Sequence, residues 1–463
     1  MTSIQNLSIK IFNIRRKVQQ LLTMERILVL SFAVFILSGT FMLMLPQATN
    51  GSPLKFIDVL FTATSATCVT GLVVVDTGIK FTLLGQLIIL TMIQLGALGI
   101  MTFSTAFLYV LEGRLSLGSR DLLYETLSQG PMPNIKRLLK TVFFATMAIE
   151  GIGSIILTLR FLSEMPPTKA IYYGVFHAIS AFCNAGFSLY SDSLMLYKND
   201  LIVNFTITSL IILGGLGFIV IYELPRLRKF HLHDLSFHSR LVLVMTIILI
   251  FTGALLFFAL ESKNSIENMP WQTKILTSLF QSVTTRTAGF NTIDISLLSN
   301  PSLFIIIIFM FIGASPASCG GGIKITTFAI LFALIRARFR NQDDVNLFYR
   351  RIPSESVSKA ISITFFSAVV VLLCTMLLLI TELAGLSHYE SRGLSIELLF
   401  EVTSAFATVG LSAGATPDLS SAGRILITLM MFIGRLGPLT IAMTVGRKQK
   451  THYKYAQEKI LVG

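Results

Sequence analysis

Charged residues are scarce in this chain. Asp, Glu, Lys and Arg make up 13% of its 463 residues, whereas soluble domains carry about 25%. The stretch 27–49 contains no charged residue over 23 positions, and about 20 apolar residues are enough to cross a bilayer core. The stretch also lacks the small-residue cleavage pattern of a signal peptide. These absences argue against a soluble domain and predict a membrane-embedded protein.

Motifs of metal sites and enzymes are missing too. There is no HExxH or GxSxG sequence and no nucleotide-binding motif, which speaks against a membrane enzyme. The net charge of +13 comes from basic residues at predicted helix ends, so it indicates membrane orientation and not nucleic-acid binding. The cysteines lie far apart, without CxxC or Cys/His spacing, and predict buried free thiols: Cys68, Cys183, Cys319 and Cys374.

What the chain does contain is a fourfold internal repeat. Four short segments share one pattern, and the glycine near the end of each lies 115, 103 and 121 residues from the next. These intervals are close to a quarter of the chain, so the repeats cover the whole protein. The segments are Ser65–Leu72, Ser180–Phe187, Val283–Phe290 and Ser404–Leu411.

A second pattern, GxLG, keeps register with the first. It begins at Gly96, Gly214 and Gly434, which follow the repeat glycine by 25, 28 and 24 residues. In the third repeat Gly313 holds the equivalent position, but the motif then gives way to a glycine-rich stretch that ends at Gly322. Two motifs in register across four segments indicate one repeated structural unit.

Each repeat is predicted to contain a long apolar helix, a short segment, the glycine motif and a second long helix. Short segments such as 54–64 cannot span a membrane and suit re-entrant pore helices, whose extended return must be buried or line a water-filled cavity. The predicted fold class is an all-α membrane protein with four tandem helix–pore helix–helix repeats around a single central pore. The long helices are expected near 27–48, 81–110, 138–162, 201–224, 239–260, 302–335, 360–386 and 423–445, and the repeats at 1–110, 111–224, 225–340 and 341–463.

Basic residues predict the orientation. With eight spans both termini lie on one side, which then carries 25 of the 37 Lys and Arg residues, against 10 on the other side. Lys324 and Arg435 fall within the membrane. By the positive-inside rule, both termini are expected to be cytoplasmic and the glycine loops to enter from outside.

The glycine loops suit cation binding. A cation that crosses a bilayer needs fixed oxygens in place of its water shell, and rings of backbone carbonyls supply them. Glycine adopts dihedral angles closed to other residues and lets the backbone approach an ion. The segment 408–410 reads Thr-Val-Gly, the start of the potassium-channel filter.

The repeated helix–pore helix–helix arrangement and these glycine loops resemble the Ktr/Trk/HKT superfamily of potassium transporters, most of all its Ktr-type membrane subunit. The matching segments are 65–72, 182–187, 285–290 and 407–411, and the likeness covers essentially the whole chain. It implies K⁺ uptake across the plasma membrane of a bacterial-type cell, with Na⁺ as a second candidate ion on which uptake could depend. It also implies that one glycine per repeat, with the carbonyls of the two residues before it, forms the filter: Val69, Thr70 and Gly71; Asn184, Ala185 and Gly186; Thr287, Ala288 and Gly289; Thr408, Val409 and Gly410. A single glycine per repeat, where tetrameric channels have Gly-Tyr-Gly, is compatible with a less selective filter.

The glycine-rich stretch 313–322 cannot continue a stable helix. The resemblance implies an intramembrane gating loop beneath the filter; a plain kink or close helix packing is the alternative. A phosphate-binding loop is disfavoured because Gly322-Ile323-Lys324 lacks the required ending. The gate residues predicted here are Gly313, Ser315, Gly320, Gly321, Gly322, Lys324 and Arg435.

Arg435 occupies the second position of its GxLG motif, where a mid-membrane charge costs at least about 2.5–3.5 kcal/mol and is a functional candidate by default. The resemblance implies that it faces the pore below the filter, where the loop carbonyls could accept its hydrogen bonds. The alternative is a salt bridge to Glu150, itself a membrane-embedded acid, or to the terminal carboxylate.

Partners and competing functions follow from the remaining features. The resemblance implies a homodimer seated on a cytosolic ring of nucleotide-binding regulatory subunits. Basic loops around 226–229 and 336–340 suit anionic membrane lipid or an acidic partner, and no nucleic-acid partner is expected. An ion-coupled secondary solute transporter is the alternative function, although its repeats usually form two inverted halves. One acid follows each filter segment, either as a cation-attracting ring or as ordinary loop charges: Asp76, Asp192, Asp294 and Asp418.

Overall fold

The computed structural model describes residues 24–112, 135–226, 234–385, 387, 391, 393–437 and 440–441. Regular structure in these ranges is helical apart from one short hairpin of β1 (Asn346–Leu347) and β2 (Arg350–Arg351). The terminal segments 1–23 and 442–463, for which a cytoplasmic location is predicted, lie outside the described residues, as do positions 227–229 of one basic loop.

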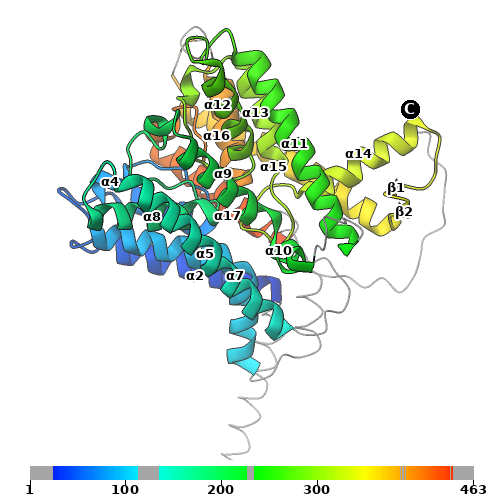
Figure 1. Cartoon of the computed structure of the whole chain (residues 1–463), viewed down its shortest axis with the longest axis horizontal. Coiled ribbons are helices and arrows are strands. Elements are labelled where there is room, and N and C mark those ends of the chain that lie inside the picture. Colours follow the sequence, from blue (N-terminus) through cyan, green and yellow to red (C-terminus); the bar gives the residue numbers. More distant parts are fainter. Residues whose placement is uncertain are drawn as a thin grey trace, which may run out of the picture.

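A long helix, a short helix and a second apolar helix follow one another four times along the chain (Figure 1). We call these groups units 1 to 4. Unit 1 contains α2 (Met24–Leu43), α3 (Phe56–Cys68) and α5 (Leu83–Glu112); unit 2 contains α7 (Ile135–Phe161), α8 (Pro167–Phe182) and α9 (Leu201–Leu216); unit 3 contains α11 (Phe237–Glu261), α12 (Trp271–Thr284) and α13 (Asn300–Phe311); unit 4 contains α15 (Ser354–Glu382), α16 (Leu394–Ala407) and α17 (Ser421–Leu436).

Three of the second helices end earlier than the sequence predicted. The helix expected over 423–445 ends at Leu436, where Gly437 has φ 86° and ψ 135°. The expected helix over 201–224 is wrong as one continuous element, because Gly217 has φ 91° and ψ 145° and separates α9 from α10 (Phe218–Glu223). The freed Phe218 N–H donates to the carbonyl of Ala317, 2.8 Å away, so a long-range bond replaces the helical one. In unit 3, α13 stops at Phe311 and α14 (Ile325–Phe339) resumes beyond the glycine-rich stretch.

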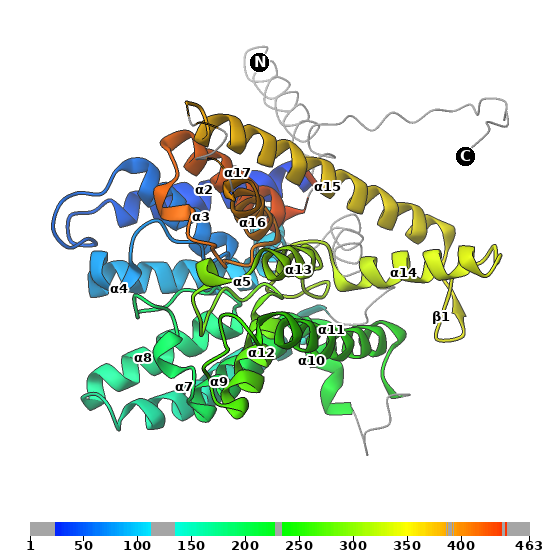
Figure 2. The ribbon, with the colours of Figure 1, turned by 90° about the horizontal axis from the view of Figure 1, so that it is seen from above.

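The four units contact one another in a closed order. Helix α5 packs on α8, α9 on α12, α13 on α16, and α17 returns to α3, so the last unit lies against the first (Figure 2). One buried cluster joins Phe61 and Leu72 of unit 1 to Phe406 and Met431 of unit 4. Apolar burial across each boundary therefore holds the arrangement together.

The long helices have the character of membrane spans. Among the described residues, Lys140–Phe161, Phe237–Glu261 and Ser354–Glu382 are long and apolar enough to cross a bilayer. Large apolar side chains on their outer faces remain exposed, among them Phe251 at 69% and Phe365 at 71%. Because water would penalise such surfaces, their natural surroundings are lipid chains.

Candidate functional site

The four glycine motifs adopt one backbone conformation. In each, the glycine and the residue two places before it both have positive φ, the left-handed region that non-glycine residues rarely adopt. Four recurrences of the same uncommon geometry mark a shared structural requirement. The φ values are 57° and 92° for Val69 and Gly71, 58° and 68° for Asn184 and Gly186, 70° and 80° for Thr287 and Gly289, and 50° and 90° for Thr408 and Gly410.

The four glycines meet in a ring. A Cβ atom added to each would strike the backbone carbonyl that precedes the glycine of the next unit, so only glycine permits this approach. The contacts would be 2.5 Å from Gly71 to Ala185 O, 2.8 Å from Gly186 to Ala288 O, 2.6 Å from Gly289 to Val409 O and 2.1 Å from Gly410 to Thr70 O. The structure thus brings together all twelve predicted loop residues, from four distant parts of the chain.

A hydroxyl group from each short helix holds the loop that follows it. The hydroxyl group either accepts a hydrogen bond from the glycine N–H or donates one to the carbonyl of the residue after the glycine. The backbone is thereby fixed beside the ring. The bonds are Ser65 Oγ to Leu72 O at 2.7 Å, Ser180 Oγ to Phe187 O at 2.8 Å, Thr284 Oγ1 to Phe290 O at 2.5 Å, and Gly410 N to Ser404 Oγ at 3.0 Å.

The first GxLG glycine has a packing role in three units. In each of these units, a Cβ atom on this glycine would clash with the carbonyl oxygen of the residue four places before the ring glycine. The distances would be 2.0 Å for Gly96, 1.8 Å for Gly214 and 1.7 Å for Gly434. The second helix therefore packs directly on the end of the short helix in these units. Gly313 is the exception, because its nearest neighbour is the carbonyl of Gly321 in its own loop, at 2.2 Å.

A cavity of about 430 Å³ opens above the ring. All four ring glycines line it, together with three of the four predicted acids, Asp76, Asp192 and Asp294. Asp418 is not among the residues that line this cavity, although its neighbour Pro417 is. The carboxylates of Asp76 and Asp294 also cap short helices by accepting from Ile79 N and Ser296 N, so the acids combine a local structural role with a position near the mouth.

The glycine-rich loop of unit 3 lies against the other side of the ring. Gly321 N donates to Thr408 Oγ1 at 2.9 Å, and a Cβ atom on Gly320 would lie 2.0 Å from Thr287 Oγ1. Two further bonds tie the loop to unit 2, from Ser315 N to Gly215 O and from Cys319 N to Gly214 O. The loop backbone is thus hydrogen-bonded although it is irregular and buried, as irregular backbone at membrane depth must be.

Arg435 reaches this loop from unit 4. Its guanidinium donates to the carbonyl of Cys319 and to that of Gly96, the latter at 2.7 Å. Lys324 donates to Gly320 O at 2.7 Å. Within the described residues no carboxylate pairs with Arg435, so the alternative of a bridge to Glu150 is wrong, and the terminal carboxylate lies outside the described part of the chain. Two basic side chains therefore bind one loop through its carbonyls.

Glu150 has neutral partners. Gln94 Nε2 donates to it at 3.3 Å, and Cys183 Sγ lies 3.8 Å from it. Glu150 is 3% exposed, and its partners Gln94 and Cys183 place its carboxyl group at the boundary of units 1 and 2. The four predicted free thiols are confirmed as buried free cysteines.

Sequence reasoning missed three buried polar residues beside the ring. His177, Glu401 and Arg286 are 0%, 0% and 6% exposed. His177 and Glu401 each stand nine places before a ring glycine, a coincidence that comparison of whole repeats, and not only their motifs, would have found. Arg286 bonds Thr246 Oγ1 at 3.3 Å, and its Nε has no partner among the described residues.

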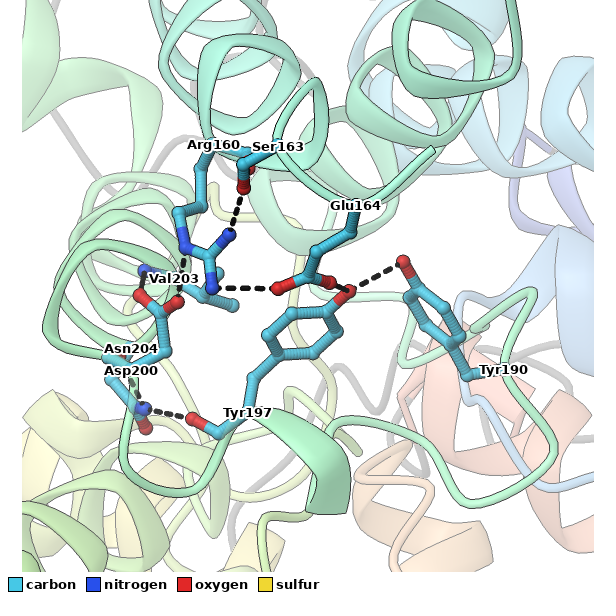
Figure 3. Close-up of polar contacts among 8 residues, drawn as sticks. All are labelled: Arg160, Ser163, Glu164, Tyr190, Tyr197, Asp200, Val203 and Asn204. Carbon is cyan, nitrogen blue, oxygen red and sulfur yellow. Dashed lines mark hydrogen bonds and ion pairs between the residues drawn. The ribbon is translucent and has the colours of Figure 1, made fainter. Parts of the chain in front are cut away.

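Beside the cavity, Tyr190 belongs to a hydrogen-bond and ion-pair network in unit 2 (Figure 3). Arg160 donates to Asp200 and, at 2.7 Å, to Glu164. Glu164 also accepts a hydrogen bond from the Tyr197 hydroxyl at 2.8 Å. The Tyr197 hydroxyl oxygen in turn lies 3.0 Å from the Tyr190 hydroxyl oxygen. Burial raises the pKa of Tyr190 to about 12, so its phenol remains neutral and available for hydrogen bonding.

Together, a mostly helical, membrane-type fold and a ring of backbone carbonyls define a membrane transport protein. The chain belongs to the TrkH family, described as cation transport protein, which it matches over residues 6–452. It is 40% identical over 440 residues to Ktr system potassium uptake protein B of Vibrio alginolyticus, covering 95% of this chain and 94% of that one. It is 33% identical over 457 residues to Potassium/sodium uptake protein NtpJ of Enterococcus hirae, covering 97% and 99%.

The fold has a solved counterpart. The crystal structure of the potassium transporter TrkH from Vibrio parahaemolyticus superposes with a TM-score of 0.70, covering 90% of this chain and 83% of that one at 17% sequence identity. The family and the helical fold predicted from the sequence are thereby confirmed.

Proposed function

We propose that this chain takes up K⁺ across the plasma membrane through the ring of glycine loops. The ring contacts carry the proposal: the carbonyls of Thr70, Ala185, Ala288 and Val409 converge where the four glycines meet. Such carbonyls replace the hydration shell of a cation. The uptake function named for the relatives in Vibrio and Enterococcus agrees with this chemistry.

In this proposal the four units are tandem repeats, at 1–110, 111–224, 225–340 and 341–463, around one pore, and both termini are cytoplasmic. The filter residues are the twelve loop residues of the ring, and the cavity above it receives cations from outside. Na⁺ is a second ion to test, because one relative is named for potassium and sodium.

The gate in this proposal is the loop 313–322 with Lys324 and Arg435. Bonds from Arg435 to Cys319 O and Gly96 O hold the loop beneath the ring, and a fixed positive charge there repels a cation that leaves the filter. Opening requires these bonds to break. One relative is named as protein B of a Ktr system, which supports a further subunit; in this proposal that subunit is a cytosolic nucleotide-binding ring, which regulates a lipid-embedded homodimer.

Uptake into liposomes tests the function. The purified full chain is reconstituted into K⁺-loaded vesicles, and uptake of radioactive rubidium is followed with K⁺, Na⁺ or sucrose as external competitor. We expect rubidium uptake that K⁺ suppresses more strongly than Na⁺. Absence of uptake both from the chain alone and from the chain with Arg435 replaced by Met, each verified as folded, would contradict the proposal.

A further inference from the structure

Behind two of the four glycine loops lies a second hydrogen-bonded support, and the two supports are built alike. His177 in α8 and Glu401 in α16 each stand nine residues before their ring glycine, Gly186 or Gly410. Both are fully buried. In the two other units the same position holds Thr62 and Phe280.

The partners of His177 and Glu401 match in register. His177 Nε2 lies 3.1 Å from Ser188 Oγ, and Leu189 N donates to it at 3.4 Å. Glu401 Oε1 accepts from Ser412 Oγ at 2.7 Å and from Ala413 N at 2.9 Å. In both cases the partners are the residues two and three places after the ring glycine.

Both side chains use their second polar atom as well. His177 Nδ1 lies 2.8 Å from Tyr173 O. Because Nε2 accepts from a backbone N–H, the neutral ring must donate from Nδ1 to that carbonyl. Glu401 uses its second oxygen to accept from the hydroxyl of Thr416. Each side chain therefore ties the loop above the ring to the short helix from which it projects.

The surroundings of His177 extend the support to the outer surface. The ring of Tyr190 lies 5.2 Å from the imidazole, and Tyr190 belongs to the network that includes Tyr197, Glu164 and Arg160 (Figure 3). Phe290, next to the third ring glycine, also faces His177 at 6.4 Å. The imidazole thus links two neighbouring loops to the ends of α7 and α9.

Units 1 and 3 have no equivalent within the described residues. Thr62 Oγ1 donates to Asp58 O inside its own helix, and Phe280 has no polar group. Since units 2 and 4 are not neighbours in the ring, the supports stand on opposite sides of it. Serine or threonine hydroxyl groups hold all four loops. The additional bonds from His177 and Glu401 hold only the two loops of units 2 and 4.

We infer that His177 and Glu401 are positioning residues that set the preference of the filter for K⁺ over Na⁺. The two loops they hold carry Gly186 and Gly410, which lie in the ring and line the cavity above it. A ring held rigidly cannot contract around the smaller ion, whereas a loosely held ring can. Removing either side chain also leaves a buried N–H, of Leu189 or Ala413, without its acceptor. This inference rests on the proposed function.

The test measures ion preference in liposomes. His177→Leu and Glu401→Leu remove the acceptor at similar volume, and His177→Gln restores an acceptor near Nε2. Thr62→Val is the matched control at the same register. We expect the ratio of K⁺ to Na⁺ inhibition of rubidium uptake to fall about tenfold in each Leu variant, as the loss of a buried hydrogen bond allows, with partial recovery in His177→Gln and no change in Thr62→Val.

An unchanged ratio in folded Leu variants would overturn the inference while leaving the proposed function intact. If either Leu variant does not fold, Ser188→Ala and Ser412→Ala, which remove the hydroxyl partners on the loop side, are measured instead, and an unchanged ratio in both has the same meaning. Failure of both the unmodified protein and its Arg435→Met variant to take up rubidium, each verified as folded, would instead reject the proposed function.

Discussion

Arg424 at the start of α17 forms an ion pair with Asp58 in the first turn of α3, 366 residues away in the chain. The pair joins the last unit to the first at the end of the molecule where the short helices begin. Arg424 also donates to Pro417 O at 2.8 Å, beside the cavity. Unlike the other unit boundaries, this one joins segments from opposite ends of the chain, and a charged contact supplements the apolar packing there.

Breaking this pair should destabilise the protein. Arg424→Met leaves the Asp58 carboxylate, whose side chain is 10% exposed, without its partner. We expect a loss of about 1–3 kcal/mol, between the values for exposed and for fully buried pairs. Thermal unfolding of the detergent-solubilised protein measures the effect. Arg338→Met, which removes an exposed pair with Asp343, is the control, and equal effects of the two variants would contradict the prediction.

Glutamates at the ends of two long helices offer an internal comparison. Glu261 and Glu382 stand 28 residues before their ring glycines, and each accepts from the serine ten residues after that glycine. Glu261 is fully buried and also accepts from Ser302 Oγ and Ser265 N. Glu382 is partly exposed.

Glu261→Gln should therefore be the more damaging change. The change replaces a buried carboxylate that accepts several hydrogen bonds by an amide, whose NH₂ group faces other hydrogen-bond donors. We expect this mismatch to lower the free energy of unfolding by about 1–3 kcal/mol. Water can relieve the same mismatch in Glu382→Gln, for which we expect less than about 1 kcal/mol. Melting temperatures in one detergent compare the two, and the reverse order would show that burial does not decide the outcome.

The ring glycines should not tolerate even a methyl group. Gly410→Ala places Cβ about 2.1 Å from Thr70 O at a φ of 90°, so the loop must shift as well as accept backbone strain. We expect rubidium uptake to fall to about a tenth or less. Gly414→Ala is the matched control, because φ is 106° but the nearest atom lies 3.6 Å away. Similar losses in both would assign the effect to strain alone.

Releasing the loop beneath the ring should raise flux. Arg435→Met removes the charge and the bonds to Cys319 O and Gly96 O. We expect rubidium influx to rise up to about tenfold, which corresponds to about 1.4 kcal/mol of barrier. Arg435→Lys keeps the charge but loses the planar guanidinium group that donates to two carbonyls, so its rubidium influx should be intermediate. Deletion of 314–318 should act in the same direction, and unchanged influx in both Arg435→Met and the deletion would reject the gate.

The sequence by itself determined the repeating parts of this protein. Low charge and apolar runs required membrane helices, because unpaired charge and exposed backbone are costly in lipid. The glycine spacing located all four loops of the ring, because a position that only glycine can occupy holds glycine in every repeat. Such signals are local, and they recur in register, so a single chain reveals them.

Only the tertiary structure decided how the unequal residues are used. The partners of Arg435 are backbone carbonyls of the loop and of Gly96, which no side-chain pattern encodes. The break of α9 at Gly217 depends on Ala317 being close enough to accept from Phe218. Likewise, His177 and Glu401 are different residue types that hold equivalent loops. Their equivalence lies in hydrogen-bond geometry, which arises only when distant segments pack together.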